Sequence, residues 1–260
     1  MTGRAAIRQA IEAWLSEQPA AAVGGETVGR GGDLEGFTTG LLAKFGPDRV
    51  VDLPAADATV LGWATGRAIS GRPTLALLPD ATPLPSAAAF LADATASQAP
   101  LILAAPSGAG AIAPLLGVPV FVPCDPNDVG TQLAAALRTA GPVVILWPHR
   151  SLNAITAMAL PVGKEAVVLA WGDAVSDAVA GVARSGVDAT VLALTALNGD
   201  LDPATLSSGR IVVAHRGDPA QADRVRLLAM DAAFEFLECP TAIAEGPDGV
   251  AAALRAAIAW

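Results

Sequence analysis

The chain has 260 residues, which suffices for one large α/β domain or two modest ones and for a core that needs no disulfide or metal. Only 16% of the residues are charged, 53% are hydrophobic and the net charge is −9. Because phosphate contacts require clustered Lys and Arg, and no basic run here exceeds two residues, this composition excludes nucleic-acid binding.

The scarcity of charge and the abundance of alanine have two interpretations. A chain with little polar surface is suited to large buried subunit interfaces, which would make it part of an assembly. Alternatively, the alanine content reflects only a GC-rich genome. The composition alone does not separate these interpretations.

The cysteines and the N-terminus bear on location. Cys124 and Cys239 lie far apart and match neither metal nor redox spacings, so we expect buried, reduced thiols. Residues 1–15 predict an amphipathic helix and lack the continuous apolar segment of a signal peptide. Pro, Gly or a charge interrupts every apolar run before the ~20 residues of a membrane span. We therefore expect a soluble, cytoplasmic protein without membrane contact.

Apolar strands alternate with helices through the first 150 residues, and a glycine-rich loop at 24–40 follows the first helix. The expected strands are 49–52, 74–78, 101–104, 118–122 and 143–147. The expected helices are 1–15, 41–45, 58–70, 86–96 and 129–139. This alternation is typical of a parallel sheet with helices on both faces.

The pattern weakens over residues 151–164 and then starts again. The later strands are expected at 166–170, 189–194, 210–214 and 241–244. The later helices are expected at 175–185, shortly after Asp202, at 221–237 and at 249–260. We therefore predict an α/β protein with a domain at 1–150, a linker at 151–164 and a smaller α/β domain at 165–260.

Common catalytic motifs are missing. The glycines at 29, 31 and 32 do not follow a predicted strand with dinucleotide-loop spacing, and no GxxxxGK[ST] occurs. Ser107 lacks the sequence of a nucleophile elbow, so nothing indicates a stand-alone hydrolase. His149 and His215 are too few for a histidine metal site. Each is either a catalytic base or, more commonly at a strand end, a structural residue.

One spacing resembles the motif that holds Mg²⁺ and diphosphate in thiamine diphosphate enzymes, which is Gly-Asp-Gly followed by a later Asn. Gly172 and Asp173 precede Asn198 by a suitable distance, but the third position is Ala174 and the segment lies in the second predicted domain. We interpret the match as chance. The chain is therefore expected to have no metal-binding residues of its own.

Four segments near the N-terminus occur in a distinctive order. Residues 25–29 are GETVG, 36–41 are GFTTGL, 44–50 are KFGPDRV and 52–57 are DLPAAD. Together they resemble the β subunit of the E1 component of 2-oxo acid dehydrogenases, in the thiamine diphosphate-dependent, transketolase-like superfamily. Shorter likenesses continue at 122–137, 142–149, 167–172 and 209–215, so a shortened and divergent form of that subunit covers nearly the whole chain.

The resemblance implies a fold, a partner and a cofactor. It implies a transketolase-like pyrimidine-binding domain followed by a transketolase C-terminal-type domain. Family members pair with an α-type subunit in an α₂β₂ assembly. Thiamine diphosphate lies across that interface, with Mg²⁺ and the diphosphate held by the α chain. The substrate would be a 2-oxo acid or ketose, and a lipoyl carrier is a further possible partner.

The resemblance also assigns site residues. A buried family glutamate that activates the aminopyrimidine ring aligns with Asp57, which keeps the carboxyl group but is shorter by one methylene. Burial would raise the pKa of such a carboxyl group. The alternative is that Asp57 is only an N-cap of the following helix. Glu26 aligns with an acidic residue near the passage between paired sites, and its alternative is an ordinary loop carboxylate.

The chain departs from the family in two places. Pro79 and Asp80 fall in the cofactor-binding segment, but residues 78–85 lack the aromatic side chains that pack on the pyrimidine ring. A family loop with a substrate-contacting histidine is missing after residues 101–108. Two hypotheses follow: a thiamine diphosphate-dependent β-type subunit for acyl or ketol transfer, with Asp57 and Glu26 catalytic, or a catalytically degenerate subunit with a scaffolding role.

Overall fold

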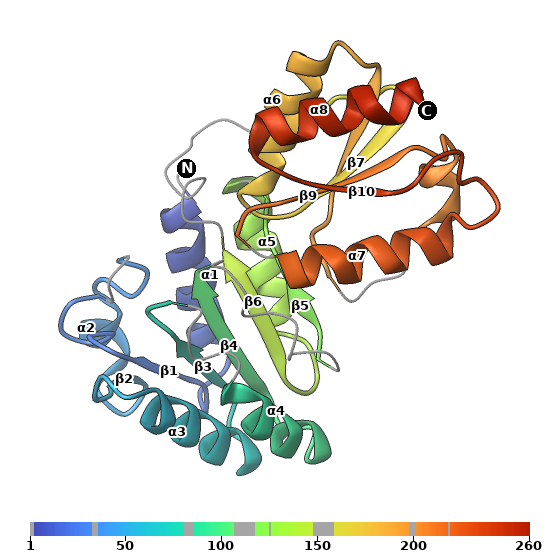
Figure 1. Cartoon of the computed structure of the whole chain (residues 1–260). Coiled ribbons are helices and arrows are strands. Elements are labelled where there is room, and N and C mark those ends of the chain that lie inside the picture. The colour runs from blue at the N-terminus through green and yellow to red at the C-terminus, as the bar shows by residue number, and fades with distance from the viewer. Residues whose placement is uncertain are drawn as a thin grey trace. The chain divides into compact units, whose positions relative to one another are not determined.

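The computed structural model describes residues 3–32, 36–80, 86–106, 118–124, 126–147, 159–197, 201–217 and 219–260. These residues form two compact units, one with the residues from Gly3 to Trp147 and one with those from Ala159 to Trp260 (Figure 1). Each unit contains one parallel sheet, so the predicted α/β class with two parallel sheets is confirmed.

The first unit is built on a six-stranded sheet in the order β2-β1-β3-β4-β6-β5, in which every pair is parallel. The strands are β1 (Ala22–Gly25), β2 (Val50–Asp52), β3 (Thr74–Leu77), β4 (Leu101–Pro106), β5 (Val120–Phe121) and β6 (Val143–Trp147). The central strands are short and apolar, and β3, β4 and β6 are buried along their whole length. Burial on both faces explains these continuous apolar runs.

Helices cover both faces of this sheet. They are α1 (Gly3–Glu17), α2 (Leu41–Phe45), α3 (Asp57–Ile69), α4 (Ala87–Ala96) and α5 (Pro126–Ala136). On one face α1 packs with α5 over a core that includes Ile11, Leu75 and Ile145, and on the other α3 packs with α4 (Figure 1). The ring of Phe37 meets that of Trp147 edge to face, with centroids 4.9 Å apart.

The second unit is a four-stranded parallel sheet in the order β10-β9-β7-β8. Its elements are β7 (Ala166–Ala170), α6 (Ala174–Ser185), β8 (Ala189–Ala193), η4 (Pro203–Leu206), β9 (Ile211–His215), α7 (Pro219–Ala232), β10 (Ala242–Glu245) and α8 (Gly246–Ala259). Figure 1 shows α6 and α8 on one face of the sheet and α7 on the other. Both cysteines are buried and neither forms a disulfide, as predicted. Among the helices described, none is long and apolar enough to cross a membrane.

Most predicted elements lie within three residues of the observed ones, but two predictions were wrong. The glycine-rich loop expected at 24–40 overlaps β1, which ends in Gly24 and Gly25 and lies between β2 and β3 in the first sheet. The helix expected at 221–237 ends at Ala232, because the chain beyond it binds another loop: the Glu238 backbone N–H donates to the Gly209 carbonyl.

Candidate functional site

The strand order of the first sheet defines a natural binding edge. The chain passes from β1 outward to β2, then crosses back over β1 to β3. In open parallel sheets, ligands bind outside the carboxyl ends of the strands where the winding reverses in this way. The segments that follow β1, β2 and β3 therefore form the candidate site.

Asp57 lies on this edge, five residues after the end of β2. It is the first residue of α3, and its side chain is exposed. The N-cap is Ala56, whose extended backbone places its carbonyl to accept the N–H groups of Thr59 and Val60. The alternative reading of Asp57 as the helix N-cap is thus wrong by one residue. The burial expected for this carboxyl group is also missing in the isolated chain.

Glu26 follows β1 directly and is half-buried. It opens a tight turn in which Thr27 has φ 53°, a left-handed conformation that is uncommon for a residue with a side chain. β1 pairs with both β2 and β3, and parallel strands are about 4.8 Å apart. The fold therefore brings the segment that carries Glu26 beside the one that leads to Asp57.

Pro79 and Asp80 lie at the carboxyl end of β3, on the other side of β1. Leu78 extends this strand, because its backbone N–H donates to the Ala104 carbonyl at 2.8 Å. Pro79 is half-buried and Asp80 is exposed. All four residues singled out in the sequence thus follow three neighbouring strands on one edge of one sheet.

Sequence reasoning missed Asp52, the last residue of β2. Its carboxylate accepts backbone N–H groups from Gly29 and Arg30, in the same loop that carries Glu26. The signal was present in the sequence, since a carboxylate at the end of a predicted strand points toward the binding edge. It was overlooked because β1, and with it the position of this loop, was not predicted.

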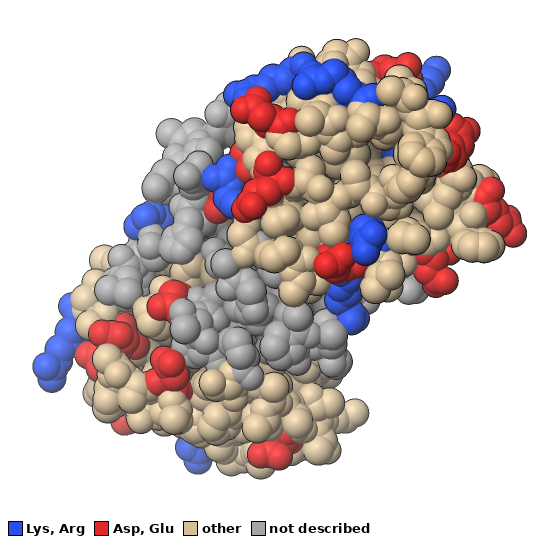
Figure 2. Space-filling view, in the orientation of Figure 1, with Lys and Arg blue, Asp and Glu red and all other residues tan. Residues whose placement is uncertain are grey.

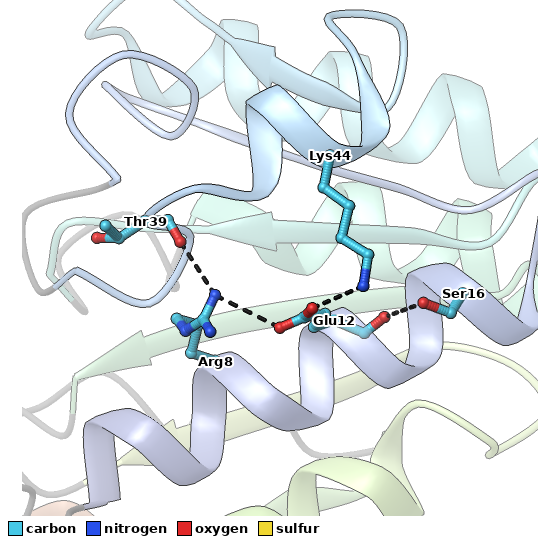
Figure 3. A network of polar contacts seen from close by, with 5 residues as sticks. All are labelled: Arg8, Glu12, Ser16, Thr39 and Lys44. Atoms are coloured by element: carbon cyan, nitrogen blue, oxygen red, sulfur yellow. Dashed lines mark hydrogen bonds and ion pairs between the residues drawn. The ribbon is translucent and has the colours of Figure 1, made fainter.

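A second set of contacts involves Thr38 and Thr39, near the end of the glycine-rich segment 24–40. The ion pairs of this set are drawn in Figure 3. The carboxylate of Glu12 on α1 lies 2.7 Å from Lys44 Nζ and 3.4 Å from Arg8 Nη1, and Arg8 also donates to the Thr39 carbonyl. The hydrogen bond from Lys44 lowers the pKa of Glu12, and Arg8 adds to this effect. Thr38, which is fully buried, donates from Oγ1 to the Val28 carbonyl at 2.7 Å.

The carboxyl groups of this edge fit the aminopyrimidine end of thiamine diphosphate. An aminopyrimidine ring needs a carboxyl partner, and Asp57 and Glu26 offer carboxyl groups on an accessible edge. A diphosphate with Mg²⁺ needs several oxygen ligands close together. In the part of the chain that the structure describes, no three His, Cys, Asp or Glu residues lie where they could hold a metal ion.

The second unit places its polar residues differently. His215 ends β9 and is buried, while Arg216 forms a two-pronged ion pair with Asp177 on α6. Gly172 and Asp173 lie at the start of α6. Ser107, His149 and Asn198 lie outside the described residues, so their predictions stay untested.

Comparison with known proteins places these features in context. No family model matches the chain. It is 28% identical to the pyruvate dehydrogenase E1 component subunit beta of Acholeplasma laidlawii, over 90% of the chain and 85% of the relative. It is 26% identical to the 2-oxoisovalerate dehydrogenase subunit beta of Pseudomonas aeruginosa, over 92% and 85%.

The fold comparison agrees. A split-gene transketolase, solved as an inactive β4 tetramer, superposes with a TM-score of 0.72 at 18% identity over 100% of this chain and 98% of the other. The two sheets are therefore transketolase-like. Sequence and fold together make this chain a divergent relative of the β subunits of 2-oxo acid dehydrogenase E1 components.

Proposed function

We propose that this chain is the β-type subunit of a thiamine diphosphate-dependent enzyme that cleaves a 2-oxo acid or ketose and transfers the acyl or ketol unit. The observation that carries the proposal is the exposed carboxyl group of Asp57, beside the Glu26 loop on the binding edge of a transketolase-like sheet. Residues 1–150 would form the pyrimidine-binding domain, 151–164 the linker and 165–260 the C-terminal domain.

The chain's own residues would prepare the cofactor. Asp57 would hold a proton in a hydrogen bond with the aminopyrimidine ring, after a partner surface covers it and removes water. Glu26 would supply a second carboxylate on the same edge, and Pro79 and Asp80 would border the ring. When bound, thiamine diphosphate supplies the carbanion chemistry of its thiazolium ring.

An α-type partner would supply what this chain lacks. Mg²⁺ and the diphosphate would be held by that chain, because no metal-binding group occurs among the described residues of this one. The solved neighbour of nearly equal length is a β4 tetramer and inactive, which supports self-association and a need for a partner. We propose an α₂β₂ assembly in the cytoplasm, where buried thiols outside disulfides, such as those of Cys124 and Cys239, persist, with a lipoyl carrier as a further partner.

The surface is suited to subunit contacts. Figure 2 shows charged side chains scattered between broad uncharged areas on the face in view. Large apolar side chains are exposed on both units: Ile69 at 47%, Leu227 at 60%, Phe234 at 79% and Trp260 at 80%. A partner that covered these side chains would remove their apolar surface from water.

A degenerate, scaffolding subunit is the second candidate. It is favoured by the segment after β3, where Leu78, Pro79 and Asp80 provide no aromatic surface for a pyrimidine ring, and by the short side chain of Asp57. In this case Asp57 would serve only the first turn of α3.

Co-expression with an α-type chain separates the two candidates. The purified complex is assayed for turnover of pyruvate, 2-oxoisovalerate and ketose phosphates with thiamine diphosphate and Mg²⁺. The enzymatic proposal predicts turnover that Asp57→Ala lowers at least ~10²-fold while the complex stays intact. A stable complex with no turnover, or with turnover that ignores the Asp57→Ala change, favours the scaffold.

A further inference from the structure

Asp52 meets two successive backbone N–H groups of the loop at 26–32. Gly29 N lies 2.5 Å from Oδ1, and Arg30 N lies 3.4 Å from Oδ1 and 3.3 Å from Oδ2. Hydrogen bonds to an ionised acceptor are about twice as strong as neutral ones. The Arg30 guanidinium lies 3.7 Å from Oδ2 but is 92% exposed, so its ion pair adds little. The hydrogen bonds from the Gly29 and Arg30 backbone therefore provide most of the attraction between Asp52 and the loop.

The sequence leaves room for this carboxylate. A Cβ atom built on Gly29 would lie 3.1 Å from Asp52 Oδ1 and 3.2 Å from both Cγ and Oδ2, which is tighter than ordinary packing. Glycine at this position thus allows the carboxylate to approach the backbone closely. Asp52, the last residue of β2, therefore requires glycine at position 29, the fourth residue of the loop.

The loop is held under local strain. Thr27, next to Glu26, keeps a left-handed backbone, which persists only when surrounding contacts fix it. Those contacts are Asp52 on one side and Thr38, through the Val28 carbonyl, on the other. Because β1 ends at Gly25, Glu26 has no strand hydrogen bonds of its own to fix its position.

The geometry points to Asp52 as a positioning residue of the site: its carboxylate fixes the Glu26 loop against the end of β2, the segment that leads to Asp57. The contact between Asp52 and the loop rests on the observed hydrogen bonds, and its importance for catalysis rests on the proposed function. In the chain, residues 53–56 connect Asp52 to Asp57, and the Leu53 backbone N–H donates to the Gly25 carbonyl at 2.9 Å. One carboxylate thereby sets the relative position of two others.

The mechanics are tested on the full chain alone by amide hydrogen exchange. In Asp52→Asn, exchange at Gly29 and Arg30 is expected to be about tenfold faster than in wild type, and in Asp52→Ala faster still. Gly29→Ala should give a smaller increase by displacing the carboxylate. Exchange in β9 should not change. The control, Asp48→Asn, removes the same charge from an exposed residue before β2 and should leave the loop unaffected.

Unchanged exchange at Gly29 and Arg30 in both Asp52 variants would overturn the inference, as would equal acceleration in Asp48→Asn or in β9. The site role is tested in the complex with an α-type chain. There Asp52→Asn should lower kcat about tenfold and leave the half-saturating thiamine diphosphate concentration within about threefold. Unchanged kcat in an active complex overturns the positioning role. If the wild-type complex binds no thiamine diphosphate, the proposed function fails, while the exchange result still decides the loop contacts.

Discussion

Asp57 is exposed and opens α3, so its negative charge lies at the positive end of the helix dipole. The proposed chemistry needs this carboxyl group in a site from which water is excluded, and only a second surface can cover it. Under the proposed function, Asp57 therefore acts only in an assembly.

A longer acid at this position should act better than the native one. If the shorter aspartate limits contact with the cofactor, Asp57→Glu should raise turnover of the assembled enzyme severalfold, because the carboxyl group advances by about 1.5 Å. Steady-state kinetics of the complex check this. Asp93→Glu, an exposed aspartate on α4, is the control and should have no effect. Lower turnover in Asp57→Glu would mean that the site is built around aspartate.

Arg49 should contribute measurably to stability. Its guanidinium donates to the carbonyls of Ala21, Leu15 and Gln18 at 2.9, 2.5 and 2.7 Å, which ties the end of α1 to β2. Burial lowers the pKa of Arg49, but a guanidinium stays charged at neutral pH. Arg49→Ala should reduce the free energy of unfolding by about 1–3 kcal/mol.

Chemical denaturation measures this loss, with Arg138→Ala as the control. Arg138 is 62% exposed and forms a surface ion pair with Glu17 and one exposed hydrogen bond to the Ala134 carbonyl at 3.3 Å, so its removal should change stability by less than about 1 kcal/mol. Equal losses of unfolding free energy in the two variants would show that the carbonyl contacts of Arg49 stabilise the fold no more than the surface contacts of Arg138 do.

At the scale of elements, β1 depends on glycine because its backbone is approached closely. A Cβ atom on Gly24 would lie 2.5 Å from the Trp63 ring on α3. Gly24→Ala should therefore cost about 1–3 kcal/mol through overpacking. Adding Trp63→Leu should recover part of the loss. Gly66→Ala, on the same helix with nothing within 4 Å, should instead stabilise by about 0.5–1 kcal/mol. Thermal denaturation shows whether each variant is more or less stable than wild type. Unchanged stability in Gly24→Ala would contradict the close packing of Gly24 against Trp63.

The partly buried ion pair of the second unit joins α6 to the end of β9. Asp177 is 6% exposed, and removing Arg216 leaves this carboxylate without its two-pronged partner. Asp177→Ala should destabilise by about 1–3 kcal/mol, because the Arg216 that remains is 31% exposed, and the double change with Arg216→Leu should be less harmful than Arg216→Leu alone. The control is Asp248→Ala, which breaks an exposed pair with Arg184 and should cost less than about 1 kcal/mol. Additive losses at Asp177 and Arg216 would contradict the coupling.

The same elements show what could be predicted from sequence. Buried strands such as 143–147 and helices such as 175–185 were predicted correctly or within one residue, because apolar periodicity and flanking turn residues indicate burial directly. β1 was missed because its glycines are required by close packing against Trp63 and Leu77, which are distant in sequence. Asp57, Glu26, Pro79 and Asp80 were found through family motifs. Asp52 was not, since its contacts with Gly29 and Arg30 depend on the position of β1, which was not predicted.

At the scale of the whole molecule, the proposed function gives this chain the residues that contact the aminopyrimidine ring and gives a partner chain those that hold the diphosphate and Mg²⁺. Its first sheet presents carboxyl groups at the winding reversal, and no cluster of metal ligands occurs among the described residues. Its relatives are β subunits of E1 components, and its solved neighbour is inactive as a β4 tetramer. Sparse charge and exposed apolar side chains are suited to a surface that another subunit covers.

Calorimetric titration with thiamine diphosphate in the presence of Mg²⁺ tests most directly whether the cofactor site requires both subunits. The ligand is added to the chain alone, to an α-type partner alone and to their complex. We predict saturable binding in the complex at one molecule per β chain, weakened by Asp57→Ala, and none to this chain alone. Saturable binding to the isolated chain, or no binding to a stable complex, would contradict the account.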